Sequence, residues 1–196
     1  MLRPEEKIGL FEIFNKRENS RVNAMIPEIR KILYVTDLSD NSAYAFRHAV
    51  DFAEKYNAKI IILHVLQDLP FYAQGAVQSY FTEEEKKRFS DEAISHLVEL
   101  IRKRLKVFCE KELRNIPETT NRIESIGVFR GYPANEILKK VDELECDAIV
   151  MGTHGKGIIR DTYLGSMTKK ILRRVRKSVF VIPLPKDESD ITFHDV

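Results

Sequence analysis

The sequence is poor in the residues that define small disulfide-bonded and membrane proteins. It contains two cysteines and no tryptophan. Cys109 lies in a helical run and Cys146 lies just before an expected strand, with no metal-ligand type of neighbour. This pattern is typical of a reducing cytoplasm. No apolar run reaches the roughly 18 residues that a membrane-spanning helix needs, so we expect a soluble cytoplasmic protein.

An excess of charge of one sign is also missing. The 196 residues carry 32 lysines and arginines against 30 aspartates and glutamates, a formal net charge of +2. This balance argues against a dedicated nucleic-acid binder and against an acidic disordered chain. The charges mixed among the first apolar residues argue against a secretory signal. The length suits one domain with an appendage.

Three regions are expected along the chain. Residues 1–30 indicate an N-terminal extension, residues 31–185 the main domain, and the polar, acidic residues 186–196 a flexible tail. Four apolar residues of the extension have the spacing of one face of a short helix: Ile8, Leu10, Phe11 and Phe14. Such a face must pack on its own core or on a second subunit, and we favour the subunit.

Short apolar runs alternate with helical patterns throughout the main domain. Strands are predicted at residues 32–35, 60–65, 123–129, 148–151 and 179–182. Helices are predicted after Ser39, from a capping box at Thr82 to about residue 113, from Pro133, and from Ser166 to about Arg176. The second run is almost wholly apolar and β-branched, which is typical of a central strand covered on both faces.

This alternation predicts an α/β fold of three layers, α/β/α. The expected sheet has five parallel strands in the Rossmann-like order 3-2-1-4-5, with right-handed connections. In such sheets ligands bind beyond the carboxyl ends of the strands, where the strand order reverses. We therefore expect a crevice between the first and fourth strands, where Asp37 and Gly152 lie.

A glycine-rich loop follows the fourth predicted strand. Gly152, Gly155 and Gly165 with Ser166 form the pattern Gly-x2-Gly-x9-Gly-Ser, which returns to a helix start. Glycine lets backbone N–H groups approach an anion closely. The first helical turn adds unpaired N–H groups at the positive end of its dipole, and Ser166 and Thr168 add hydroxyls. The loop predicts a phosphate site; the alternative is that its glycines serve only in turns.

Two commoner phosphate loops do not match. A Walker A loop needs Gly-x4-Gly-Lys-Ser/Thr, but Val150 stands at its first position and Gly157 follows Gly155-Lys156. The dinucleotide fingerprint Gly-x-Gly-x-x-Gly fails at its last position, which is Arg160. The loop is therefore of another type.

Four segments in order resemble the universal stress protein family. They are residues 34–39 (YVTDLS), residues 62–65 (ILHV), Gly131-x-Pro133, and the loop from Met151 through Ser166. The similarity spans about residues 30–184. Family members with this loop intact bind ATP or a related adenine nucleotide, with Mg²⁺ held through the phosphates. The resemblance also implies a homodimer paired through the fifth strand.

The resemblance implies a set of nucleotide-binding residues in this chain. They are Val35, Thr36, Asp37, Val65, Met151, Gly152, His154, Gly155, Gly165, Ser166, Met167 and Thr168. The first and second strand ends should line the adenine, and Met151 and Gly152 should pack by the ribose. Asp37 should lie near the ribose or a phosphate-bound metal, while the loop and helix start hold phosphates. One departure is Val35, where several binders carry proline.

Several residues at or near the expected site also have a simpler interpretation. Asp37 can merely help to start a helix, although its place at a strand end favours a site role. His64 is typical of a hydrogen-bonded core histidine. His154 can contact phosphate or face the solvent, and the loop cations Lys156 and Arg160 can be solvated. Ser166 can be an N-cap, a role compatible with phosphate binding.

A run of cations occupies the last predicted helix. Its members are Lys169, Lys170, Arg173, Arg174, Arg176 and Lys177. Crowded towards the C-terminus, they complement the helix dipole. No aromatic residue interleaves with them, as a stacking surface for single strands requires. The run therefore indicates a solvated face rather than a nucleic-acid surface.

The sequence thus predicts an adenine-nucleotide-binding regulatory module that is dimeric and acts in stress response. A slow ATP hydrolase is one alternative, because Asp37 is the only acid that can be placed at the crevice. A nucleotide-free interaction scaffold is the other. No catalytic residue and no protein-bound metal site are assigned.

Overall fold

The structure is a computed structural model that describes residues 27–67, 83–153 and 164–183. Most of the N-terminal extension, the capping residue Thr82, the loop residues His154 and Gly155, and the acidic tail lie outside the described residues. Predictions about these parts stay predictions.

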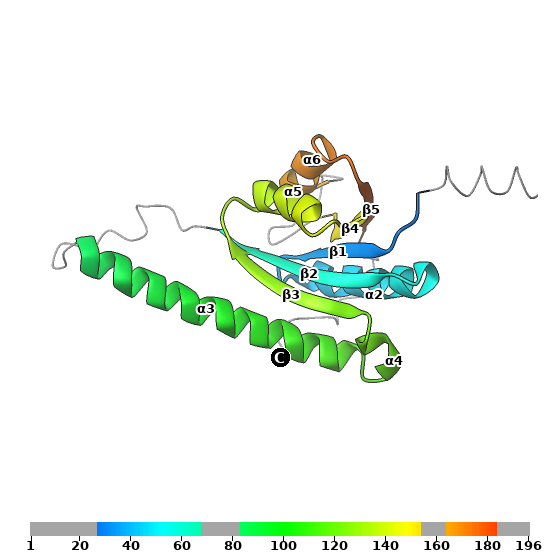
Figure 1. The fold of residues 1–196 in the computed structure, drawn as a ribbon, viewed down its shortest axis with the longest axis horizontal. Coiled ribbons are helices and arrows are strands. Elements are labelled where there is room, and N and C mark those ends of the chain that lie inside the picture. Colours follow the sequence, from blue (N-terminus) through cyan, green and yellow to red (C-terminus); the bar gives the residue numbers. More distant parts are fainter. Residues whose placement is uncertain (1–26, 68–82, 154–163, 184–196) are drawn as a thin grey trace, which may run out of the picture.

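Five parallel strands form one sheet in the order β3-β2-β1-β4-β5 (Figure 1). The strands are β1 (Lys31–Thr36), β2 (Lys59–Leu66), β3 (Ile123–Arg130), β4 (Ala148–Gly152) and β5 (Ser178–Ile182). The central strand β1 pairs with β2 along its whole length and with β4 over Ile32, Leu33 and Tyr34. The predicted strand order is confirmed, and so is the reversal of order at β1.

Helices cover both faces of this sheet (Figure 1). They are α2 (Asp40–Tyr56), α3 (Glu83–Glu112), α4 (Pro117–Thr120), α5 (Pro133–Glu143) and α6 (Ser166–Leu172). Helices α2 and α3 pack on one face, whereas α5 and α6 pack on the other. This is the predicted α/β/α arrangement. No helix among the described residues is long and apolar enough to span a membrane.

Each face of the sheet has its own apolar core. On the α2 and α3 side, the Phe46 ring lies 5.2 Å from the Tyr34 ring and 5.3 Å from the Phe108 ring, measured between centroids. On the α5 and α6 side, Leu33 packs with Ile137 and Ile171. All of these side chains are at most 2% exposed, and burying each stabilises the fold by about 1.5–3 kcal/mol. Two-sided burial explains why β1 and β2 are continuous apolar runs.

Helix α6 is shorter than predicted, since it ends at Leu172 rather than near Arg176. Its last residues place like charges four positions apart, Lys169 with Arg173 and Lys170 with Arg174. Such pairs destabilise a helix. After Leu172 the chain turns, with the Arg174 amide donating to the Ile171 carbonyl at 3.0 Å.

The turn between β3 and α5 requires glycine. Gly131 has φ +149°, and a Cβ there would lie 2.9 Å from Cγ of Glu136. Its amide donates to the Leu66 carbonyl at 3.0 Å, which ties the turn to the end of β2. Pro133 then starts α5 as predicted. The short helix α4 also begins with proline, but it is not among the helices predicted from the sequence.

Candidate functional site

The carboxyl ends of β1 and β4 lie side by side at the middle of the sheet. Asp37 follows β1, and Thr153 follows β4. The neighbouring strands β2 and β5 lie on opposite sides of this pair, so the strand order reverses here. An open parallel sheet binds ligands at such a point.

Hydrogen bonds hold the Asp37 carboxylate in place. Its Oδ1 accepts from the Ser42 hydroxyl at 2.6 Å, the Ser39 hydroxyl at 2.5 Å and the Ser39 amide at 3.1 Å. In return, the Asp37 amide donates to Ser42 Oγ at 3.2 Å. Three donors to one oxygen favour the charged carboxylate. The end of β1 therefore presents a fixed anion that is only partly buried.

The first turn of α2 differs from the expected cap. Ser39 occupies the N-cap position, as predicted, but its hydroxyl makes no cap hydrogen bond to a backbone amide of the helix. It donates instead to Asp37. Sequence reasoning missed Ser42, which is 4% exposed and makes the shortest contacts to Asp37 together with Ser39. The only sequence signal was a second serine three residues after the first.

Thr36 and His64 fix the adjoining ends of β1 and β2. His64 is 8% exposed, and its Nδ1 lies 2.8 Å from the Thr36 carbonyl oxygen. Because a carbonyl only accepts, Nδ1 carries the proton. The Thr36 hydroxyl accepts from the Leu38 amide at 3.1 Å. The interpretation of His64 as a hydrogen-bonded core residue is confirmed.

On the other side of the crevice, the start of α6 is tied to the end of β4. The Gly165 amide donates to the Thr153 carbonyl at 2.8 Å. The Thr168 hydroxyl contacts the carbonyls of Gly152 at 3.3 Å and Thr153 at 3.2 Å. Gly165 is the N-cap of α6, so Ser166 is its first helical residue rather than its cap. These bonds bring both ends of the glycine loop to the crevice.

They also limit which groups can serve an anion in this arrangement. The Gly165 amide and the Thr168 hydroxyl already donate to carbonyls. The amides of Ser166, Met167 and Thr168 come before Lys169, whose amide makes the first bond of α6, to the Gly165 carbonyl. They have no acceptor among the described residues. With the exposed Ser166 hydroxyl, they are the donors that remain at this end of α6.

The apolar residues of the predicted set lie on one face of the sheet. Met151 is 5% exposed and belongs to the core beneath α5 and α6, while Val35, Val65 and Met167 are partly buried against that core. Three come from strand ends and one from the first turn of α6. Together they form an apolar wall next to the polar crevice. His154 and Gly155 lie outside the described residues.

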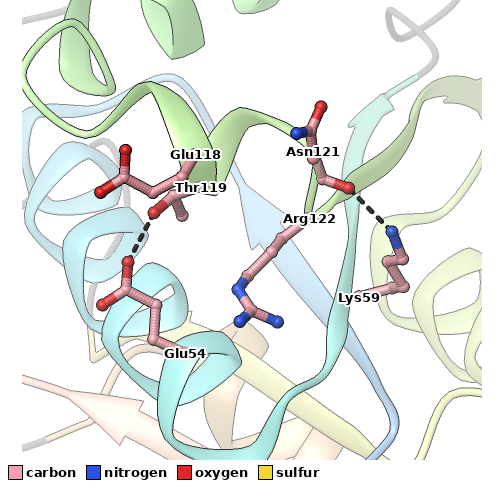
Figure 2. Close-up of a pocket in the computed structure, with 6 residues that line it drawn as sticks. All are labelled: Glu54, Lys59, Glu118, Thr119, Asn121 and Arg122. Atoms are coloured by element: carbon pink, nitrogen blue, oxygen red, sulfur yellow. Dashed lines mark hydrogen bonds between the residues drawn. The ribbon is translucent and has the colours of Figure 1, made fainter.

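A separate cleft of about 520 Å³ lies at the opposite end of the strands, where β2 and β3 begin (Figure 2). Lys59, the first residue of β2, lines it. The Thr119 hydroxyl donates to the Glu54 carboxylate at 2.5 Å, and Lys59 Nζ donates to the Asn121 carbonyl at 2.8 Å. This mixed-charge cleft contains no residue of the predicted set. Among the described residues, no cluster of three metal-ligating side chains is found.

The match to a family model decides the classification. The model of the "Universal stress protein family" matches residues 28–183, which include every strand of the sheet. The chain belongs to the universal stress protein family.

Individual relatives agree with this assignment. Universal stress protein MJ0531 of Methanocaldococcus jannaschii is 29% identical over 165 residues, 81% of this chain and 85% of that protein. Universal stress protein MJ0577 of the same organism is 26% identical over 157 residues, covering 78% and 94%.

Solved structures show the same fold. The structure of MJ0577 covers 82% of this chain and 99% of its own, with a TM-score of 0.59 at 24% identity. UspA from Lactobacillus plantarum covers 79% and 98%, with a TM-score of 0.56 at 23% identity. These matches cover between 85% and 99% of the relatives' own lengths.

Proposed function

We propose that this universal stress protein binds an adenine nucleotide in the crevice between β1 and β4. The observation that carries the proposal is the joint placement of Asp37 and both ends of the glycine loop. Gly165 and Thr168 bond to the end of β4, directly beside the strand that Asp37 terminates. The pattern Gly-x2-Gly-x9-Gly-Ser marks the nucleotide-binding members that this chain resembles.

The apolar wall supports an adenine ring on the α5 and α6 side. Val35, Val65 and Met167 are partly buried there, so they keep apolar surface in reach of a flat ring without a large rearrangement. Backbone groups at the end of β2 would give the ring its orientation. An apolar wall with a few polar groups is the usual composition of a small-molecule site.

The start of α6 supports the phosphates. Amides at Ser166, Met167 and Thr168, with the Ser166 hydroxyl, donate towards an anion. Asp37 would repel bare phosphate but suits a phosphate-bound Mg²⁺, which prefers carboxylate and phosphate oxygens. The fixed Asp37 carboxylate therefore favours nucleotide together with Mg²⁺ over nucleotide alone.

Thermal unfolding with and without nucleotide tests the proposal. A ligand that binds only the folded state raises the midpoint, by an amount equivalent to about 2.7 kcal/mol at a hundred times its Kd. We expect ATP with Mg²⁺ to raise the midpoint of the intact protein. Gly165→Val should abolish the rise, because its side chain would stand where the phosphates approach. No rise with ATP, ADP or AMP in the intact protein rejects the proposal.

The proposed role is regulatory rather than catalytic. Fast hydrolysis needs a base that positions and deprotonates water. Asp37 Oδ1 is already an acceptor for three donors, which suits a structural anion better than a proton-transfer group. If the protein is instead a slow ATP hydrolase, it should release phosphate, and Asp37→Ala should abolish this release. Asp37→Asn should still bind the nucleotide.

The regulatory unit in this proposal is a homodimer joined through β5. This strand pairs only with β4 in the described sheet. Its outer edge therefore has backbone donors and acceptors that a second copy can pair with.

A further inference from the structure

The surface of α6 and the turn after it has a concentration of positive charge. Residues 166–177 contain six lysines and arginines and no acid. We call these six residues the α6 basic face: Lys169, Lys170, Arg173, Arg174, Arg176 and Lys177. Five of them are exposed and Lys177 is partly buried.

The basic face has neutral partners where other helices use carboxylates. Lys170 donates to the Tyr132 hydroxyl, and Arg174 donates to the Asn135 side-chain oxygen at 2.8 Å. Several cations on other helices are paired with acids, for example Lys140 with Glu143 at 2.6 Å. No ion pair joins the basic face to a carboxylate of the described residues. Its charge is therefore uncompensated within the described domain, and such a surface attracts anions.

The chain leaves the sheet close to this face. The Ile182 carbonyl at the end of β5 accepts from the Thr153 amide at 3.0 Å. The Thr153 carbonyl in turn accepts a hydrogen bond from the Thr168 hydroxyl of α6 at 3.2 Å. Two hydrogen bonds therefore link the last residue of β5, through Thr153, to the first turn of α6.

The residues that follow have the complementary composition. Within residues 184–196 there are four acids, Asp187, Glu188, Asp190 and Asp195, against a single lysine. Ile191 and Phe193 alternate with polar residues in the same segment. The basic face likewise surrounds an apolar side chain, Leu172, which is 41% exposed. The acidic segment and the α6 basic face are thus opposite in charge, and both include apolar side chains.

The reach of the segment is sufficient. An extended chain spans up to about 3.3 Å per residue, whereas a helix rises about 1.5 Å per residue. The residues after Pro183 can therefore pass along the whole of α6. Because both partners belong to one chain, the effective concentration is high even where each ion pair is weak.

We propose that the α6 basic face is the docking surface for the acidic segment 184–196 of the same molecule. In the docked state the four acids of the segment offset part of the positive charge of the face, and the segment competes with other polyanions for it. Docking is electrostatic, so it weakens as salt shortens the range of the charges. The proposal does not depend on nucleotide binding.

Carbodiimide cross-linking of the full chain tests where the segment lies. The reagent joins a carboxylate to an amine when the two are in contact. At low salt we expect peptides that link the four tail acids to Lys169, Lys170 and Lys177, and few links to the exposed control lysines Lys103 and Lys106 of α3. Equal labelling of both lysine sets overturns the proposal. In a mixture of ¹⁵N-labelled and unlabelled protein, links that run mainly between copies also overturn it.

Heparin chromatography tests the competition. In the tail variant the four acids become amides: Asp187→Asn, Glu188→Gln, Asp190→Asn and Asp195→Asn. The control variant changes four exposed acids elsewhere: Asp91→Asn, Glu92→Gln, Glu110→Gln and Glu118→Gln. Each removes four negative charges, so the formal net charge rises from +2 to +6 in both.

The expected result is that the tail variant elutes at higher salt than the control variant. Adding Lys169→Gln, Arg173→Gln and Arg176→Gln to the tail variant should remove the difference in elution, because the α6 basic face would then lose three of its positive charges. Identical elution of the tail and control variants overturns the proposal. Circular dichroism of all variants checks that the fold is kept.

Discussion

Asp37 and Ser42 are joined by a reciprocal pair of hydrogen bonds. The Asp37 amide donates to Ser42 Oγ at 3.2 Å, and the Ser42 hydroxyl donates to Asp37 Oδ1 at 2.6 Å. This pair locks the end of β1 to the first turn of α2. It leaves the carboxylate at a fixed place in the crevice, beside the site proposed for the Mg²⁺-nucleotide.

Replacement of Ser42 measures how much this pair of hydrogen bonds stabilises the fold. Ser42→Ala should lower the free energy of unfolding by about 1–3 kcal/mol, because a partly buried carboxylate and an amide each lose a partner. It should also weaken ATP binding by releasing Asp37. Urea unfolding and calorimetry check the two effects. Ser125→Ala, at an exposed position of β3, should change neither; an equal loss in both variants would contradict the role of Ser42.

Gly131 gives a second test, at the turn before α5. Gly131→Ala should destabilise the fold by about 1–3 kcal/mol, because φ +149° strains any residue with a Cβ. The double variant Gly131→Ala, Glu136→Ala also truncates the side chain that the new Cβ would meet. It should recover only the part of the lost stability that is due to steric crowding. Denaturant midpoints of the single and double variants check this. Full recovery would show that crowding, not backbone conformation, demands the glycine.

The buried thiols predict an alkaline loss of stability. Burial raises the pKa of Cys109 to about 12 and that of Cys146 to about 11. A raised pKa means that the folded state keeps its proton while the unfolded chain loses it. Stability is therefore intact below about pH 9 and falls as pH rises from 9 towards 12. The double variant Cys109→Ala, Cys146→Ala should show a shallower fall between pH 9 and 11 in urea titrations; an unchanged slope would rule the thiols out as its source.

The outer edge of β5 allows a test of the proposed dimer. The Ile182 carbonyl faces β4, since it accepts from Thr153. Backbone groups alternate along a strand, so those of Val181 face outward. Val181→Pro should remove one outward N–H and shift a β5-paired dimer towards monomers, with the ladder to β4 kept. Light scattering after size exclusion measures the mass, and Val181→Ala is the control. A dimer unchanged by proline must use another surface.

The sheet could be predicted because its signals are local and redundant. The apolar runs that became β1, β2 and β4 needed no knowledge of their partners, and the alternation with helices left few topologies. The glycine loop and the strand order both predicted a site at the carboxyl ends of β1 and β4. The ends of the loop, Gly152 and Gly165, are indeed brought together at β4.

What could not be predicted depends on contacts between distant residues or on a choice between partners. Ser39 has the right position for a helix cap, yet its hydroxyl turns back to Asp37. The Gly165 amide bonds to the Thr153 carbonyl, a contact between the two ends of the loop that the spacing of the glycines does not specify. Tyr132 reaches Lys170 only because α5 packs beside α6, so no window of sequence contains that pair.

Mapping the bound nucleotide by amide NMR tests the central claim most directly. Titration of the ¹⁵N-labelled protein with ATP and Mg²⁺ should give saturable shifts at Asp37, Val65, Gly152 and Ser166, with GTP weaker than ATP. The chemical shifts of the Lys59 and Asn121 amides, in the cleft at the opposite end of the strands, should stay unchanged. Shifts confined to that opposite cleft, or none at all at millimolar nucleotide, would contradict the proposal that the crevice between β1 and β4 is the nucleotide site.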